Sequence, residues 1–404
     1  MNTASARTHD IRSTLPRLGL REYWYPAIRA SKVGKKPVTV RMLGEDIMLM
    51  RDNGRVHAFH DRCPHRGLPL SYGKQHFPGT VSCLYHGWTF DMSGQCVTAL
   101  NEGPDSTLPA KVKVRTYATE ERCGLVWVFV GDGPPRSLDA DLPPELASGR
   151  NTVNYHIEEW ACSWLPATEN LMDSHDVFVH RRSPFYLFRK LPAWVQVGAE
   201  LSADGRAIDY RYTKMGPTQD TYPQVGKWPR QVWWRRFNVS APVPGEYPTT
   251  QLRLPCLVRV GFSSLMFVRW MVPVEENRVR AFLFSTRHAP GLQAITYAIY
   301  YRLWASWSLL KLFIGQDKVV FERQDYAAPE RLSSTDVGVV KWRRLIAATA
   351  AGTGASATAF AASSAGTSAT QMNVSPASTA APVAASAATA TAGADSVAAS
   401  GSAA

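Results

Sequence analysis

Two pairs of cysteine and histidine near the start of the chain constrain its fold more than any other feature. Cys63 and His65 are separated by one residue, and Cys83 and His86 by two. Thiolate and imidazole groups are the ligands that zinc and iron prefer in proteins. The four residues therefore predict a metal site that two neighbouring loops share.

Two metals fit this ligand set. A structural zinc site takes two thiolates and two imidazoles around one ion. A Rieske [2Fe-2S] cluster uses the same ligands differently, with two cysteines on one iron and two histidines on the other. Spacing alone leaves zinc as the alternative. The flanking residues resemble the two cluster-binding loops of Rieske proteins, in the runs Cys63-Pro64-His65-Arg66-Gly67 and Cys83-Leu84-Tyr85-His86-Gly87-Trp88. The resemblance implies that Cys63, His65, Cys83 and His86 hold a [2Fe-2S] cluster.

Length and composition predict four parts. A chain of 404 residues is long for a single core, so two domains are expected. Prolines and glycines at 131–145 mark the boundary between them. We expect an N-terminal arm at 1–20, a Rieske domain at 21–135 and a catalytic domain at 136–345. Residues 346–404 are rich in Ala, Ser and Thr and predict a disordered tail.

The pattern of apolar residues predicts an α+β fold. Short strands are expected at 38–43, 46–51 and 55–60, with a hairpin turn at Asn53-Gly54, and an apolar strand at 124–130 closes the small all-β Rieske domain. In the larger domain, strands are expected at 151–160 and through 194–285, and helices from Trp164 and over 291–324. This order suggests a helix-grip-like domain with an antiparallel sheet and helices.

Charge and cysteine content exclude several classes of protein. The net charge is +12, but the 45 Lys and Arg residues are scattered and no recognition motif accompanies them, so no nucleic-acid partner is expected. No apolar run is long enough for a membrane span, and the polar first 21 residues do not resemble a secretory signal. Six cysteines without a dense framework suit a reducing compartment, so we expect a cytoplasmic protein.

A second constellation follows at 169–180. Asn170, Asp173, His175 and His180 resemble the mononuclear-iron segment of Rieske non-haem iron oxygenases. The resemblance implies that His175, His180 and a distant carboxylate hold Fe(II) and leave positions open for O₂ and substrate. It assigns Asn170 and Asp173 to the catalytic site, with Asp173 as the link to a cluster histidine of a neighbouring subunit in a homotrimer.

The third iron ligand is expected late in the chain. Residues 316–324 resemble the carboxylate segment of the same family, and Asp317 is the predicted ligand. Glu322, Asp325 and Asp336 are the alternatives.

The spacing around Asp173 departs from the family pattern. Only one residue separates Asp173 from His175, whereas the family usually has two. An ungapped alignment would place Asp176 at the first histidine position and leave the iron site altered. A one-residue gap gives His175 and His180 as the pair, which we favour because a single histidine would leave the iron short of a ligand.

These resemblances together predict an enzyme. Stretches such as 99–106 and 121–132 look most like the carbazole and oxoquinoline group, a terminal oxygenase (alpha) component that hydroxylates an apolar, aromatic or heteroaromatic substrate with O₂. No GxGxxG motif is present, so the electrons are expected from a separate ferredoxin or ferredoxin reductase. The alternative is a Rieske electron-transfer or binding protein with a degenerate iron site.

Overall fold

The computed structural model describes residues 11–172, 179–180, 195–215, 250–262 and 265–352. Its first part is all-β, as expected, with three small antiparallel sheets in the orders β1-β10-β9, β2-β3-β4-β8 and β5-β6-β7. Its strands are β1 (Tyr23–Arg29), β2 (Val38–Met42), β3 (Glu45–Asp52), β4 (Arg55–His60), β5 (Thr80–Ser82), β6 (Trp88–Asp91), β7 (Cys96–Ala99), β8 (Thr116–Tyr117), β9 (Thr119–Arg122) and β10 (Leu125–Val130). Short 3-10 helices connect them: η2 (Ala30–Lys32), η3 (Leu70–Tyr72), η4 (Leu100–Glu102) and η5 (Pro109–Lys111).

The hairpin between β3 and β4 has the predicted turn. Asn53 has φ 46° and Gly54 has φ 79°, so both central residues adopt the left-handed conformation that a two-residue hairpin of this kind needs. Asp52 pairs with Arg55 across the turn. This fixes the register of β4, which leads directly into the first cysteine loop.

Strand β3 separates two apolar cores. Ile47 and Leu49 pack into a large core that continues into the second part of the chain, whereas Met48 and Met50 pack into a smaller one. Because successive side chains of a strand point to opposite faces, one apolar run serves both cores. The smaller core also contains Cys63, so the predicted cluster loop rests on packed side chains.

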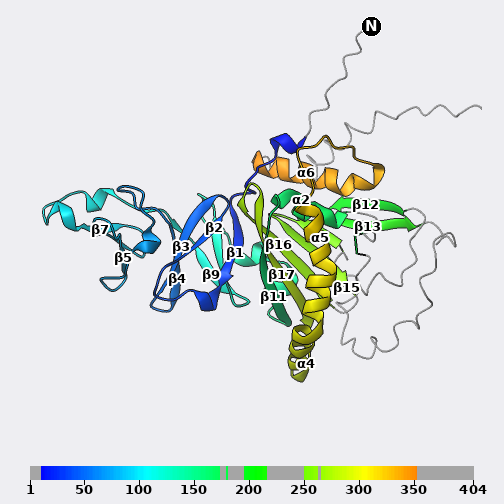
Figure 1. Ribbon diagram of the computed structural model, residues 1–404, viewed down its shortest axis with the longest axis horizontal. Helices are drawn as coiled ribbons and strands as arrows, with labels where there is room; N and C mark the ends of the chain where they lie inside the picture. Colours follow the sequence, from blue (N-terminus) through cyan, green and yellow to red (C-terminus); the bar gives the residue numbers. More distant parts are fainter. Residues whose placement is uncertain (1–10, 173–178, 181–194, 216–249, 263–264, 353–404) are drawn as a thin grey trace, which may run out of the picture. The chain divides into compact units, whose positions relative to one another are not determined.

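The second part is built on one seven-stranded antiparallel sheet in the order β11-β17-β16-β15-β14-β13-β12 (Figure 1). Its strands are β11 (Asn151–Trp160), β12 (Val195–Leu201), β13 (Ala207–Met215), β14 (Thr250–Arg253), β15 (Leu257–Phe262), β16 (Leu265–Glu275) and β17 (Arg278–His288). The sheet and its helices confirm the predicted α+β class.

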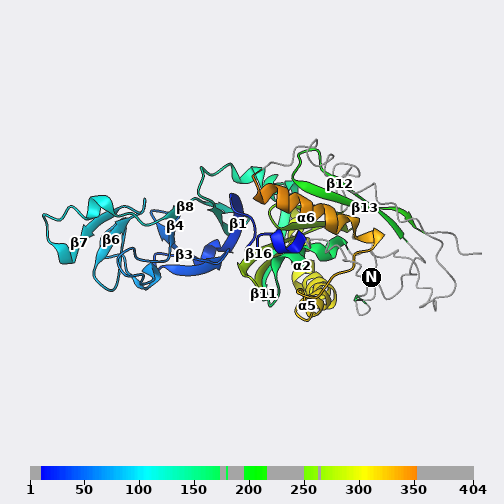
Figure 2. The same cartoon turned by 90° about the horizontal axis from the view of Figure 1, so that it is seen from above.

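Helices cover this sheet. They are α1 (Pro144–Ala147), α2 (Trp164–Glu169), α4 (Leu292–Tyr300), α5 (Gly315–Phe321) and α6 (Val337–Ala350), with 3-10 turns η6 (Leu138–Ala140), η7 (Asn170–Met172) and η11 (Ser334–Asp336). Two π-helical stretches, η9 (Tyr301–Ala305) and η10 (Trp307–Ile314), join α4 to α5 in one helical column (Figure 1). Helix α6 lies along β12 and β13, and α2 packs against β16 (Figure 2).

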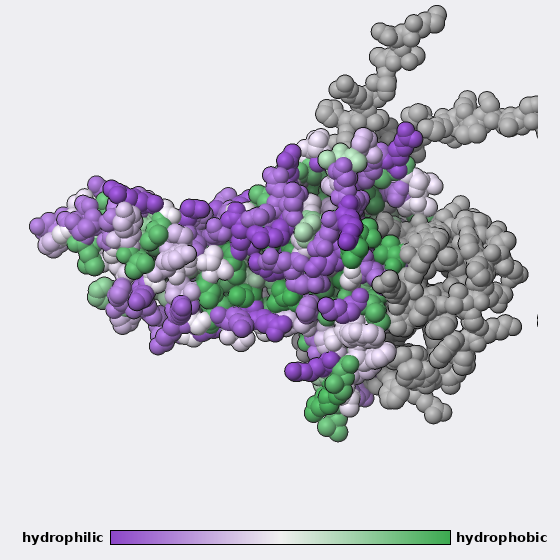
Figure 3. All heavy atoms as spheres, viewed as in Figure 1, coloured by the Kyte–Doolittle hydropathy of each residue, from purple (hydrophilic) through white to green (hydrophobic). Residues whose placement is uncertain are grey.

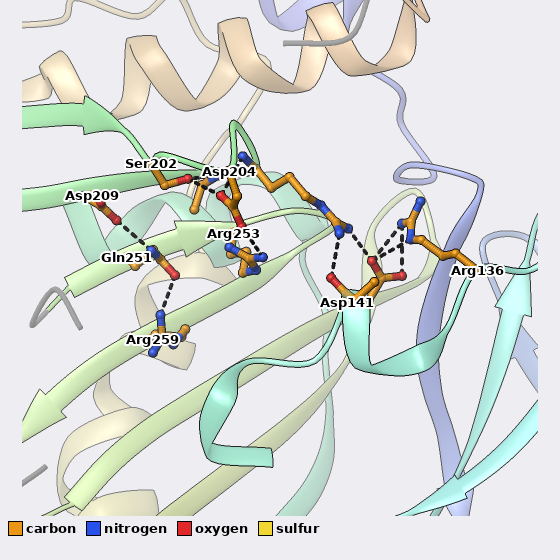
Figure 4. Close-up of polar contacts among 11 residues, drawn as sticks. Arg136, Asp141, Ser202, Asp204, Asp209, Gln251, Arg253 and Arg259 are labelled. Atoms are coloured by element: carbon orange, nitrogen blue, oxygen red, sulfur yellow. Dashed lines mark hydrogen bonds and ion pairs between the residues drawn. The ribbon is translucent and has the colours of Figure 1, made fainter. Parts of the chain in front are cut away.

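Asp141 anchors the connector between the two parts. It is fully buried and accepts hydrogen bonds from the backbone of Trp24 (3.0 Å) and from Nε of Arg136 (2.9 Å), and Arg206 also contacts it. Figure 4 shows Arg136 and Asp141 in contact, and beside them a second polar chain in which Gln251 joins Asp209 to Arg259. The Pro- and Gly-rich boundary is therefore held by a backbone hydrogen bond from β1 on one side and by an ion pair with Arg206 on the other.

Both ends of the described chain pack on the second part. The N-terminal arm begins with η1 (Ile11–Thr14), and Arg12 donates hydrogen bonds of 3.0 Å to the backbone oxygens of Tyr326 and Ala328. At the other end, α6 continues to Ala350 and fully buries Ile346. Composition predicts that the tail begins at residue 346, but the helix continues past this residue. Residues 353–404 lie outside the described part.

Candidate functional site: a cluster domain and a buried His–Asp pair

The two cysteine loops share one backbone plan. In each loop the cysteine N–H donates to the carbonyl five residues later, and a glycine four residues after the cysteine donates back to the cysteine carbonyl, at 2.8–3.0 Å. These glycines, Gly67 and Gly87, have φ of 75° and 69°, a conformation that disfavours residues with a Cβ atom. The repeated Cys-to-Gly spacing in the sequence thus produces two equivalent turns that face each other.

The four predicted ligands separate into a cysteine pair and a histidine pair. Cys63 and Cys83 are buried, and the two thiols lie within hydrogen-bond reach of each other. His65 and His86 are half-buried, with ring centroids 4.5 Å apart, and Trp88 stacks on His65 at 4.5 Å and 4°. A Rieske cluster would need this division, because two cysteines bind one of its irons and two histidines bind the other.

The chemistry of these atoms also fits a cluster. Nδ1 of His65 is buried, and within the described part of the chain it has no hydrogen-bond partner. Burial raises the pKa of the Cys63 thiol to about 11. A buried imidazole nitrogen without a partner is costly unless it binds iron, and iron bound at Cys63 would displace the proton from its thiol.

Asp61, which sequence reasoning did not single out, fixes the first loop. It is buried and accepts hydrogen bonds from the hydroxyl of Thr39 (2.6 Å) and from the backbone and hydroxyl of Ser71 (both 2.7 Å). It lies two residues before Cys63. A buried carboxylate with three donors holds the strand before the loop and the η3 turn after it together.

In the second domain, the structure brings His180 and Asp317 together. Nε2 of His180 lies 3.1 Å from Oδ1 of Asp317, and the two side chains are 1% and 4% exposed. The ring of Phe313 stacks on the imidazole, with centroids 4.0 Å apart. Asp317 belongs to α5, so the helical column presents this carboxylate to the interior.

A buried arginine joins this pair to Asn170. One terminal nitrogen of Arg269 donates to the side-chain oxygen of Asn170 (2.6 Å), and the other lies 3.5 Å from Oδ2 of Asp317. Arg269 comes from the middle of β16, and all three residues are buried. Sequence reasoning missed Arg269 because an arginine in an apolar strand carries no motif, although a charge at an inward position of a strand is itself a signal.

The neighbouring Glu169 is held in a second buried ion pair. Arg343 of α6 donates two hydrogen bonds of 2.7 Å to its carboxylate, and Glu330 also pairs with Arg343. Burial raises the pKa of Glu169, although Arg343 and the hydroxyl of Tyr326 oppose this. These contacts tie the end of α2, where Asn170 follows, to the C-terminal helix.

Two of the predicted site residues, Asp173 and His175, lie outside the described residues, as does Asp176. Of the alternative carboxylates, Glu322 is exposed and accepts from the backbone of Ala161, and Asp325 is exposed. Asp336 caps η11 through Ser333. Asp317 is therefore the one among the four carboxylates considered that is buried beside a histidine.

Comparison with known proteins supports the first assignment. Residues 23–118 match the family described as Rieske [2Fe-2S] domain. These residues contain both cysteine loops, so the first domain carries a [2Fe-2S] cluster and the chain is a Rieske iron–sulfur protein.

Relatives extend the match into the second domain. The chain is 36% identical over 283 residues to a 4beta-methylsterol monooxygenase from Methylococcus capsulatus, covering 66% of this chain and 69% of that protein. It is 24% identical over 352 residues to the terminal oxygenase component of carbazole 1,9a-dioxygenase from Metapseudomonas resinovorans, covering 81% of this chain and 90% of that one. A third match, to a carbazole 1,9a-dioxygenase terminal oxygenase from Sphingomonas, reaches 36% identity but spans only 45% of that protein.

A solved structure has a similar fold over both domains. The terminal oxygenase of carbazole 1,9a-dioxygenase from Nocardioides aromaticivorans IC177 superposes with a TM-score of 0.68 at 26% identity, over 85% of this chain and 98% of that one. The chain belongs to the Rieske non-haem iron oxygenases, and it is similar in sequence and fold to the terminal oxygenase components of carbazole dioxygenases.

Proposed function

We propose that the second domain holds a mononuclear Fe(II) at His175, His180 and Asp317. The observation that carries the proposal is the buried contact between His180 and Asp317, with Asn170 held beside it through Arg269. An imidazole and a carboxylate in contact at one buried position supply two of the three ligands of an iron site with two histidines and one carboxylate. His175 would complete it from the segment just before His180.

The chemistry divides between the two metal groups. When bound, the cluster supplies electrons one at a time and the mononuclear iron supplies reduction of O₂ for insertion into substrate. The protein's own part is to hold the ligands rigid and dry: Phe313 covers one face of the His180 imidazole, and the buried Arg269 sets a cation beside Asp317. Asp173 stays our choice for the hydrogen-bonded link to a cluster histidine of the next subunit in a homotrimer.

The substrate we propose is apolar and aromatic or heteroaromatic. Several relatives are named for ring compounds, among them carbazole, 3-chlorobenzoate and a 4β-methylsterol. Electrons would come from a separate ferredoxin or ferredoxin reductase, since solved relatives include oxygenase–ferredoxin complexes. A reducing cytoplasmic setting suits the six free cysteines of this chain.

Turnover with a surrogate donor tests this function. The purified protein is supplied with a ferredoxin, its reductase and NADH, and carbazole, fluorene and a methylsterol are offered as probes. Oxygenated product that requires both the donor proteins and O₂ is expected. Turnover of the chain alone with NADH would contradict the need for a donor, and electron uptake by the cluster without any O₂ consumption would favour the electron-carrier alternative.

Asp173→Asn tests the link between the two sites. We expect this variant to retain both metal groups and to slow the single-turnover rate, because the neutral amide oxygen accepts a weaker hydrogen bond from an imidazole N–H than the charged carboxylate does. An unchanged single-turnover rate would count against the role assigned to Asp173.

A further inference from the structure

The outer side of the helical column carries a row of exposed apolar side chains. Leu292 is 80% exposed and Leu303 is 75% exposed, and large aromatic and aliphatic residues accompany them. We call this set the exposed apolar face; it comprises Leu292, Ile295, Ile299, Leu303, Trp304 and Trp307. Figure 3 shows hydrophobic residues gathered at the lower end of the molecule, where Figure 1 places α4.

This face is distinct from the one that packs on the sheet. Tyr297, Leu309 and Phe313 of the same column are buried, and the hydroxyl of Tyr297 pairs with Ser285 of β17 at 2.7 Å. A helix that covers a sheet normally needs one apolar stripe, with polar residues opposite. The column therefore has a second apolar stripe that its own core does not use.

The charged residues within the segment that carries the exposed apolar face have one sign. From Leu292 to Gln316 the sequence contains no Asp or Glu, whereas Arg302 and Lys311 are both exposed. The whole chain carries a net charge of +12. Exposed leucine, isoleucine and tryptophan side chains, together with cations and no carboxylate on the same stretch of helix, are the composition of a helix that lies in the interface of an anionic bilayer.

We propose that the exposed apolar face lies on an anionic lipid surface, with the helical column in the plane of that surface. Within the described part of the chain, no helix is long and apolar enough to cross a membrane, so the contact would be peripheral. A second copy of this chain is the alternative occupant, which the oligomeric state of a variant of this face tests.

The position of the face links it to the active site. The column that begins at Leu292 continues into α5, which carries Asp317. An apolar substrate dissolved in the bilayer would thus meet the enzyme at the helix that supplies the proposed iron ligand. This consequence rests on the proposed function, whereas the lipid contact itself does not.

Vesicle flotation tests the lipid contact. The full-length protein, with its cluster intact, is mixed with vesicles of phosphatidylcholine alone or of phosphatidylcholine with phosphatidylglycerol, and the protein that floats is quantified by the cluster's absorbance. We expect flotation on the anionic vesicles. Replacing three central residues together (Leu292→Ser, Ile299→Ser and Leu303→Ser) should lower the bound fraction at least about tenfold, because the buried apolar area is lost.

Two further variants separate the contributions. Arg302→Gln with Lys311→Gln should weaken binding to anionic vesicles by about fivefold per removed charge and leave neutral vesicles unaffected. Phe77→Ser with Val97→Ser removes exposed apolar residues of the Rieske domain and should float like the wild type. No flotation of the wild type, or undiminished flotation of the triple serine variant, overturns the proposal. A smaller oligomer for the triple variant in light scattering also overturns it and assigns the face to contacts between copies.

Discussion

Arg269 donates a 2.6 Å hydrogen bond to the side-chain oxygen of Asn170, 99 residues earlier in the chain. The same guanidinium lies 3.5 Å from Asp317, so one buried cation fixes the positions of two residues that the sequence assigns to the iron site. A planar guanidinium with several donors can hold both partners at once, which a lysine cannot do with the same geometry.

Replacing Arg269 should disturb the second site without affecting the first. Arg269→Met leaves the buried Asp317 carboxylate without a neighbouring arginine and the Asn170 amide oxygen without its hydrogen-bond donor. We therefore expect the free energy of unfolding to fall by about 3 kcal/mol. Mononuclear iron should be lost while the cluster's visible spectrum stays. Arg269→Lys should lie between the methionine variant and the wild type in iron content.

A surface arginine provides the control for this experiment. Arg278 pairs with Glu275 at 3.1 Å, but its side chain is 43% exposed. Arg278→Met should therefore change the free energy of unfolding by no more than about 1 kcal/mol. If Arg269→Met behaved like this control in melting and in iron content, Arg269 would have no positioning role.

The spacing after Asp173 can be decided by two neighbouring substitutions. If the one-residue gap is right, His175→Ala removes the mononuclear iron and abolishes turnover, whereas Asp176→Ala retains both. The ungapped alignment predicts that His175→Ala keeps its iron content. Iron per chain, measured beside the intact cluster spectrum in both variants, distinguishes the two alignments.

Glu45 should make the Rieske domain sensitive to acid. Burial alone would raise the pKa of Glu45, but hydrogen bonds from Tyr117 and Arg21 outweigh it and lower the pKa below its usual 4.5. The ionised carboxylate therefore stabilises the fold above about pH 4.5, and this contribution is lost as the pH falls through the folded-state pKa. Below this pH, the Tm of the wild type should drop more steeply than that of Glu45→Gln. If the two curves of Tm against pH ran parallel, Glu45 would not be a cause of the sensitivity to acid.

Local patterns in the sequence predicted most of the elements. Arg55–His60 forms a strand with the expected bounds, because alternation and the Asn53-Gly54 turn both act between near neighbours. The seven-stranded antiparallel sheet confirms the expected strand-rich region. The cysteine loops were recognisable for the same reason, since each closes on itself within a few residues.

Long-range contacts could not be predicted in this way. Arg269 meets Asn170 only after β16 and α2 pack together, and no local pattern encodes that pairing. The end of α6 was also missed: composition turns to alanine after Leu345, yet Ile346 is fully buried by the sheet it covers. Tertiary burial, which composition does not report, extends the helix to Ala350.

The metal content of the protein decides whether the second domain holds iron. Protein purified without oxygen is analysed for iron, and the dithionite-reduced sample is examined by EPR. We expect a Rieske-type signal with about three irons per chain, two in the cluster and one in the second domain. The same signal with about two irons would contradict the mononuclear site and leave the chain an electron carrier with a degenerate second domain.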